Sequence, residues 1–94
     1  MQTFYMFGSY NPDAIKGMSA DRTKAAGDLV KKAGGELKSI HALLGPQDLV
    51  LVADFPGVSA AAKASLGLCK LTGISFSTSP AIAVEDFDKL ASEV

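Results

Sequence analysis

The chain has 94 residues, of which 9 are basic and 10 acidic, and its formal net charge is −1. This length fits one domain, expected to span residues 1–94, and the near-neutral charge excludes the strong positive field of a nucleic-acid-binding or membrane-surface protein. The chain is also apolar, with 48% hydrophobic residues, and a domain this short buries only roughly 60–65% of its unfolded surface. We therefore expect a second copy of the chain to cover part of the apolar surface.

The first half of the chain predicts a strand, a helix and a second strand. Residues 2–10 are rich in aromatic side chains and favour a strand. Pro12, preceded by an asparagine and followed by an aspartate, is typical of the first turn of a short helix. Apolar residues at helical spacing then predict a helix over 21–33, which two consecutive glycines end, and a strand follows over 36–44.

Charged residues of both signs lie along the predicted helix over 21–33. Arg22 and Lys24 stand beside Asp21, and Lys31 follows Asp28. Mixed signs of this kind are typical of a solvated helix face rather than of a binding patch.

The second half predicts a strand, a helix, a strand and a final helix. The segment 48–55 contains a continuous apolar run, which is typical of a central strand buried on both faces. An alanine-rich helix is expected over 58–72, and Cys69 on it is interpreted as a buried small side chain rather than a nucleophile. Alternating apolar and polar residues predict a strand over 74–79, and an amphipathic helix is expected over 84–94.

This order of elements, β-α-β-β-α-β followed by a helix, is the ferredoxin-like or split βαβ plan of the α+β class. It predicts an antiparallel four-stranded sheet with strand order 4-1-3-2, one face of which is covered by the helices over 21–33 and 58–72. The other face stays open unless a second copy covers it, so the sequence predicts a homodimer or a larger homo-oligomer.

Side chains alternate between the two faces of a strand, and this period separates an apolar set from a mixed set. Phe4 and Met6 belong to the apolar set, which we assign to the helix-covered face. The mixed set is expected on the open face, where its rings, hydroxyls and imidazole would line a small-molecule site in a dimer. Its members are Tyr5, Phe7, Ser39, His41 and Ser77.

His41 is the best catalytic candidate, because imidazole is the side chain best suited to proton transfer near neutral pH. It is the only histidine in the chain. The alternative is a histidine near the end of a strand that makes a local hydrogen bond or faces solvent.

Several segments carry a resemblance to a known family over nearly the whole chain. The segment 8–11 (GSYN) is similar to the end of the family's first strand, and 34–38 (GGELK) to its helix-to-strand turn. The segment 44–50 (LGPQDLV) is similar to the signature of the GYD-domain family, named for a Gly-Tyr-Asp motif before the third strand. The resemblance implies a ferredoxin-like fold of the dimeric α/β-barrel type and no established reaction.

The signature is matched in part. Gly45 and Asp48 stand at its glycine and aspartate positions, whereas Gln47 replaces the tyrosine and Ala14 stands where such proteins tend to have glycine. We expect Gly45 and Asp48 to be structural and to shape the hairpin between the second and third strands, because aspartate often hydrogen-bonds turn amides.

Three classes of function remain open. An oligomeric module that binds a small molecule on the sheet face ranks first. A cofactor-independent isomerase or monooxygenase-like enzyme using His41 is the second, and a purely structural or protein-interaction module is the third. We expect no cofactor, metal ion, nucleic acid or membrane partner, because metal-ligand clusters, phosphate loops and long apolar runs are absent. A single cysteine and the lack of a secretory leader lead us to expect a cytoplasmic protein.

Overall fold

The computed structural model describes residues 1–94 and contains four strands and four helices. The strands are β1 (Gln2–Ser9), β2 (Glu36–Ala42), β3 (Leu49–Phe55) and β4 (Ser75–Ala81). The helices are α1 (Pro12–Lys16), α2 (Ala20–Lys32), α3 (Val58–Thr72) and α4 (Val84–Ser92). Every predicted element is present, with its ends within two residues of the predicted positions. None of the helices combines the length and the apolar content needed to cross a membrane.

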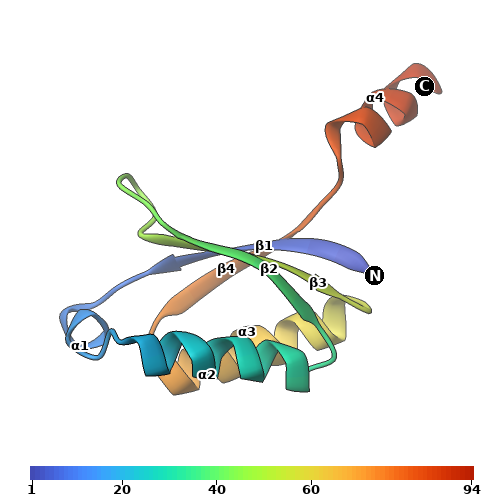
Figure 1. The fold of residues 1–94 in the computed structure, drawn as a ribbon. Coiled ribbons are helices and arrows are strands. Elements are labelled where there is room, and N and C mark those ends of the chain that lie inside the picture. Colours follow the sequence, from blue (N-terminus) through green and yellow to red (C-terminus); the bar gives the residue numbers. More distant parts are fainter.

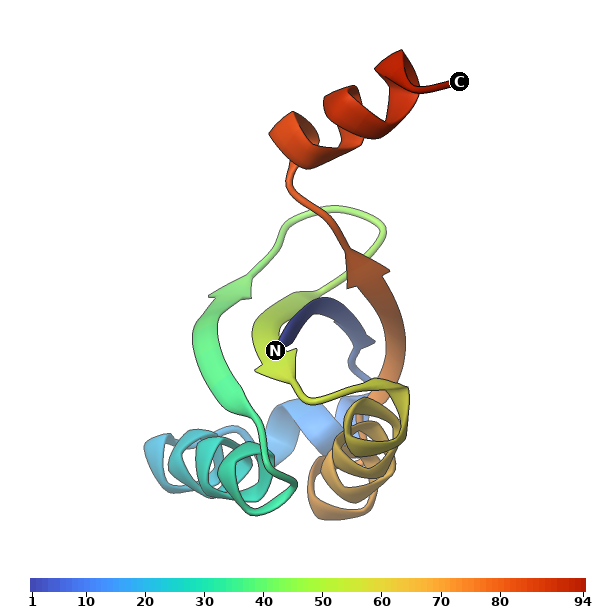
Figure 2. The same ribbon diagram turned by 90° about the vertical axis from the view of Figure 1, so that its right-hand side faces the viewer.

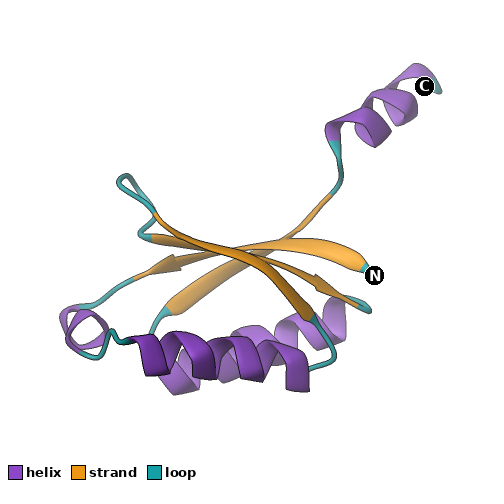
Figure 3. Cartoon of the chain, in the orientation of Figure 1, coloured by secondary structure: helices purple, strands orange, loops and turns teal.

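The strands pair antiparallel in the order β2-β3-β1-β4, which is the predicted order. β3 is central, as its continuous apolar run predicts. The expected burial on both faces is found only in part, because Val52 and Asp54 on the face away from the helices are half-buried. The helices α2 and α3 lie side by side under one face of the sheet, and no element covers the other face (Figure 1 and Figure 2). Figure 3 shows these two layers, with α4 leaving the sheet on the side opposite α2 and α3. The chain therefore has the predicted α+β ferredoxin-like fold with a C-terminal helix.

The hydrophobic core lies between the sheet and the two long helices, and it contains the predicted apolar set. Phe4 and Met6 of β1 are at most 2% exposed and pack in one cluster with residues of α2, β3 and α3. The rings of Phe4 and Phe55 meet edge to face, with centroids 5.8 Å apart. Phe4 and Met6 therefore face the helices, which confirms the predicted assignment of the alternating side chains of β1 to the two faces of the sheet.

A β-bulge interrupts β2 and changes which side chains face the helices. The register between β2 and β3 shifts between Leu37 and Ser39, so Lys38 is the additional residue. Without it, Leu37 and Ser39 would share a face, because the side-chain period of a strand is two. With it, Leu37 packs against the core while Ser39 and His41 keep the predicted open face.

Cys69 is exposed, so the prediction of a buried side chain was wrong. The buried residues of α3 are Ala61, Ala64 and Leu68, which form one stripe at helical spacing. Cys69 follows Leu68 directly and lies about 100° further around the helix, which turns its side chain away from the core.

Candidate functional site

The predicted mixed set lies on the open face in two rows that cross the sheet. One row contains Ser39, Val52, Tyr5 and Ser79, and the next contains His41, Val50, Phe7 and Ser77. Apolar and aromatic side chains thus occupy the two central strands, and polar side chains occupy the two edge strands. The rings of Tyr5 and Phe7 stack with centroids 6.4 Å apart.

These residues share a face but do not form one compact cluster. His41 and Ser77 lie on opposite edge strands, three strand spacings apart, which corresponds to roughly 14 Å. The cross-strand neighbour of His41 is Val50, so no carboxylate stands beside the imidazole in its row to orient it. Ligand binding by this face stays a prediction.

A polar cluster occupies one end of the open face. The Thr3 hydroxyl donates a hydrogen bond of 2.7 Å to the Asp54 carboxylate, and the Lys38 ammonium lies 3.6 Å from Asp54 and 3.4 Å from Glu36. The Thr3 hydrogen bond, helped by the Lys38 charge, holds the pKa of Asp54 below its ordinary 3.8. The Glu36 and Asp54 carboxylates raise the pKa of Lys38.

We expect Thr3→Val to raise the pKa of Asp54 towards its ordinary value, because valine keeps the shape of threonine and removes the donor. A carboxylate whose pKa is lowered on folding stabilises the fold above its unfolded pKa and loses that contribution as the pH falls through the folded value. The stability difference between wild type and Thr3→Val should therefore shrink below about pH 3.8. NMR titration of the Asp54 carboxyl carbon checks the pKa, with Thr78→Val on the other face as the control. An unchanged Asp54 pKa in Thr3→Val would contradict the assignment.

The signature segment joins the β2–β3 hairpin to the end of β1. The Asp48 carboxylate accepts a hydrogen bond of 2.9 Å from the Tyr10 amide, and the Asp48 amide donates to the Gly8 carbonyl at 3.0 Å. The Gln47 side chain accepts a hydrogen bond from the Ser9 hydroxyl at 3.2 Å. At Gly45 an added Cβ would meet nothing within 4 Å, so a structural role of this glycine does not come from crowding.

We expect Asp48→Ala to lower the free energy of unfolding by about 1 kcal/mol, the usual loss for one partly buried hydrogen bond. Urea denaturation measures the change. Gln47→Ala removes an exposed hydrogen bond beside it and should change stability by less than about 0.5 kcal/mol. Full stability of Asp48→Ala together with loss of ligand binding would show that Asp48 acts on a ligand instead.

A cavity of about 450 Å³ lies between the sheet and the helix layer, at the end nearest α1. Its walls come from both layers, and nine of its 13 lining residues are hydrophobic. Leu49, Leu51 and Phe76 line it from the sheet, and Leu68 and Ile74 from α3 and the segment after it. This volume and this apolar lining are typical of small-molecule sites.

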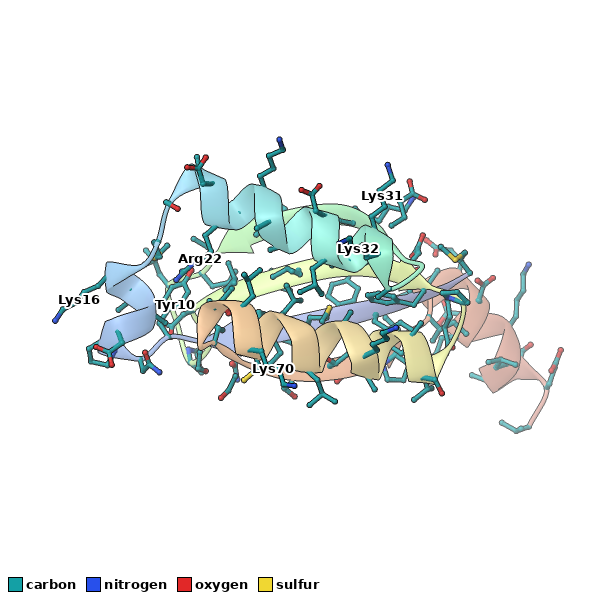
Figure 4. All side chains as sticks on the ribbon, turned by 90° about the horizontal axis from the view of Figure 1, so that it is seen from below. Tyr10, Lys16, Arg22, Lys31, Lys32 and Lys70 are labelled. Atoms are coloured by element: carbon teal, nitrogen blue, oxygen red, sulfur yellow. The ribbon has the colours of Figure 1, made fainter.

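Arg22 and Tyr10 bring polar groups to this cavity, and Figure 4 shows both at the end of the helix layer near α1. Arg22 is partly buried in the first turn of α2, where its amide donates a 3.1 Å hydrogen bond to the N-cap Ser19 hydroxyl. Its guanidinium donates one hydrogen bond, of 2.7 Å, to the Ala14 carbonyl at α1. An added Cβ at Gly17 would come within 2.9 Å of the same guanidinium nitrogen, so the glycine leaves room for it.

Arg22 has no carboxylate partner in the chain. The ion pairs of the structure both involve Lys38, which lies on the other face of the sheet. A guanidinium has five donors in a planar fork that matches a carboxylate. The cavity therefore presents an apolar volume with an unpaired cation at its wall, and this arrangement fits an apolar molecule with an anionic group.

Sequence reasoning missed this cavity, because it interpreted Arg22 as one of several solvated charges on α2. One signal was present in the sequence. Arg22 stands three residues after the N-cap Ser19, where the helix dipole and the capping box favour an acidic residue. A cation at this position opposes both preferences, which indicates a role other than helix stabilisation.

No group of three His, Cys, Asp or Glu side chains is placed to hold a metal ion.

Together these features define a class of protein: a ferredoxin-like α+β domain with one uncovered sheet face and an apolar cavity under the other. A family model of the GYD domain matches residues 4–91 of the chain. The protein belongs to the GYD domain family, as its sequence resemblance predicts. Searches of curated proteins and of solved structures found no match to the chain.

Proposed function

We propose that this GYD-domain protein is a binding module for a small, largely apolar molecule that carries a carboxylate or a similar anionic group. The observation that carries the proposal is the unpaired, partly buried Arg22 at the wall of an apolar cavity of about 450 Å³. An apolar tail in the cavity would gain the free energy of leaving water, and the anionic group would pair with the guanidinium.

One other feature supports an anion at this end of the cavity. Ser19, Arg22 and Thr23 of its lining belong to the start of α2, where the helix dipole is positive. The Thr72 hydroxyl already donates to the Leu68 carbonyl and accepts from the Ile74 amide, so it completes the end of α3 rather than binding a ligand. Arg22 and Tyr10 are thus the groups that would give the site its specificity.

The test compares octanoate with octanol, which share a tail and differ in charge. We expect the wild type to bind octanoate more tightly than octanol, measured by isothermal titration calorimetry. Arg22→Gln should weaken octanoate binding about tenfold or more, the value of one charge-assisted hydrogen bond, and should leave octanol binding unchanged. Retained octanol binding also shows that the cavity of the variant is intact.

Lys24→Gln is the matched control, because Lys24 is an exposed cation on the same helix and does not line the cavity. It removes the same charge and should leave both affinities at the wild-type value. If Lys24→Gln and Arg22→Gln lost the same affinity for octanoate, the loss would be an effect of net charge and not of the position of Arg22. Equal affinity of wild type and Arg22→Gln for octanoate would refute the proposed role of Arg22.

The open sheet face supports a second part of the proposal, self-association as a dimer of the α/β-barrel type. Its centre is apolar and aromatic, with Val50, Val52, Tyr5 and Phe7 on the two central strands. Tyr5 is 41% exposed, Phe7 and Val52 are half-buried, and Val50 is buried. A partly exposed apolar patch of this kind supports an interaction surface. A second copy facing it would bury the aromatic pair.

Two alternatives use the same face. A dimer could enclose a second ligand site between Ser39, His41 and Ser77, and an enzyme would use His41 as its proton-transfer group. The absence of an orienting carboxylate beside His41 favours binding over catalysis. A pH-dependent turnover lost in His41→Ala would support the enzyme instead.

A further inference from the structure

The helix α4 has an apolar stripe that packs against nothing in its own chain. None of its residues is buried. The stripe has helical spacing, and its members are 52% to 69% exposed: Val84, Phe87 and Leu90. A helix this short is marginal by itself in water, and most helical stability comes from packing an amphipathic face. The stripe therefore needs a partner surface.

Acidic side chains border the stripe on both sides. With about 100° between successive residues, Asp86 and Asp88 each lie about 100° from the centre of the stripe, on opposite sides of it. Glu85 lies on the far side of the helix. A partner surface that fits α4 is therefore an apolar groove with positive charges along its rims.

The outer side of the helix layer carries such a groove. It runs between α2 and α3 with a volume of about 590 Å³, and its lining includes the apolar residues Leu29, Ala33 and Leu66. Leu66 is 68% exposed. Gly67 lets α3 pack closely on Leu29 at the floor of the groove, because an added Cβ at Gly67 would lie 3.1 Å from the Leu29 side chain.

Lysines from both helices line the same groove. They are Lys32 of α2 and Lys63 and Lys70 of α3, and no acidic residue lines it. Figure 4 views this layer from outside and shows Lys32 and Lys70 on the two helices. None of the three is paired with a carboxylate. The open sheet face has no unpaired lysine at its centre, and Lys38 at one end is already paired with Glu36 and Asp54, so charge complementarity favours the groove.

The α4 of the same chain cannot reach this groove. Only Ile82 and Ala83 join β4 to α4, and two extended residues span at most about 7 Å. The helix α4 lies on the opposite side of the sheet from α2 and α3 (Figure 1 and Figure 2), and the groove is a further helix diameter, about 10 Å, beyond the sheet. The occupant must come from another chain.

We propose that α4 of one copy docks into the groove between α2 and α3 of a second copy. The apolar stripe lies on Leu29 and Leu66, and Asp86 and Asp88 lie near the lysines of the two rims. This is the helix-in-groove mode of recognition with charges that fix the partner. It does not depend on the proposed ligand, because the groove is on the outer side of the helix layer and the cavity on the inner side.

The experiment exchanges the charges between the two surfaces. The helix variant is Asp86→Lys/Asp88→Lys, and the groove variant is Lys63→Glu/Lys70→Glu. Both are made in a Val52→Lys chain, so that the open sheet face does not contribute. We expect each variant alone to self-associate at least tenfold more weakly than the Val52→Lys parent in sedimentation equilibrium. Mixing the two should restore association, and native mass spectrometry should show the heterocomplex.

The single variant Asp86→Lys is compared with Glu85→Lys, which makes the same charge change one residue earlier, on the far side of α4. It should associate like the parent. Circular dichroism checks that each variant is folded. Apart from Val52, which is half-buried, the changed residues are exposed. Unchanged self-association of the helix variant, or a mixture that associates no better than its components, would overturn the proposal. If the helix variant self-associated more weakly but the groove variant did not, α4 would dock on another surface, and this result would overturn the proposal as well.

Discussion

Phe55→Ala is expected to lower the free energy of unfolding by about 3–5 kcal/mol, the usual range for a fully buried phenylalanine. Phe55 is fully buried and meets Phe4 edge to face. The Phe55 ring also packs directly on the backbone at Gly35, where an added Cβ would come within 2.5 Å of the ring. A domain of 94 residues has a total stability of about 5–14 kcal/mol, so this loss is a large fraction of it.

Chemical denaturation measures this change, and Phe87→Ala is the matched control. Phe87 is 59% exposed on α4, so at concentrations that keep the copies apart its removal should cost less than about 0.5 kcal/mol. A loss below about 1 kcal/mol in Phe55→Ala would show that the core between sheet and helices is not packed as described.

Val52→Lys is expected to weaken association through the open sheet face by at least about a hundredfold. Val52 lies on a central strand between Tyr5 and Ser39, so a second copy facing the sheet would bury it. An unpaired buried charge costs about 3–5 kcal/mol, and a two-fold symmetric interface contains each substitution twice. Each 1.4 kcal/mol corresponds to a factor of about ten in the dissociation constant.

Sedimentation equilibrium in the Asp86→Lys/Asp88→Lys background isolates this interface from α4. Val58→Lys makes the same change at an exposed position on α3 and should leave association unchanged. Two results would contradict self-association through this face. One is an Asp86→Lys/Asp88→Lys chain that is already monomeric at micromolar concentration. The other is equal self-association of this chain with and without Val52→Lys.

The fold was predictable from the sequence because its elements have clear periods. The unbroken apolar run from Leu49 to Ala53 indicates a central strand, and alternation assigns Phe4 and Met6 to the helix side. The bulge at Lys38 was not predictable, since nothing in the local pattern distinguishes it from an ordinary strand position. Its effect was limited because it precedes Ser39 and His41.

The cavity could not be predicted in the same way, because residues distant in sequence form it together. Ile40, Leu49 and Phe76 come from three strands, and each has an ordinary apolar pattern locally. Arg22 looked like a solvated charge, because its hydrogen bond to Ala14 and its missing acid partner are properties of the folded chain. The sequence thus predicted a ligand site on the open face of the sheet, whereas the cavity lies on the face that the helices cover.

The most direct test of the proposed function is the location of bound octanoate by NMR chemical-shift mapping of the wild-type chain. The cavity site predicts the largest shifts at the Arg22 side-chain Nε–H and at Tyr10, Leu68 and Ile74, with His41 and Ser77 unchanged. Shifts centred on Tyr5, His41 and Ser77, with Arg22 unaffected, would contradict it and would place the ligand on the open sheet face.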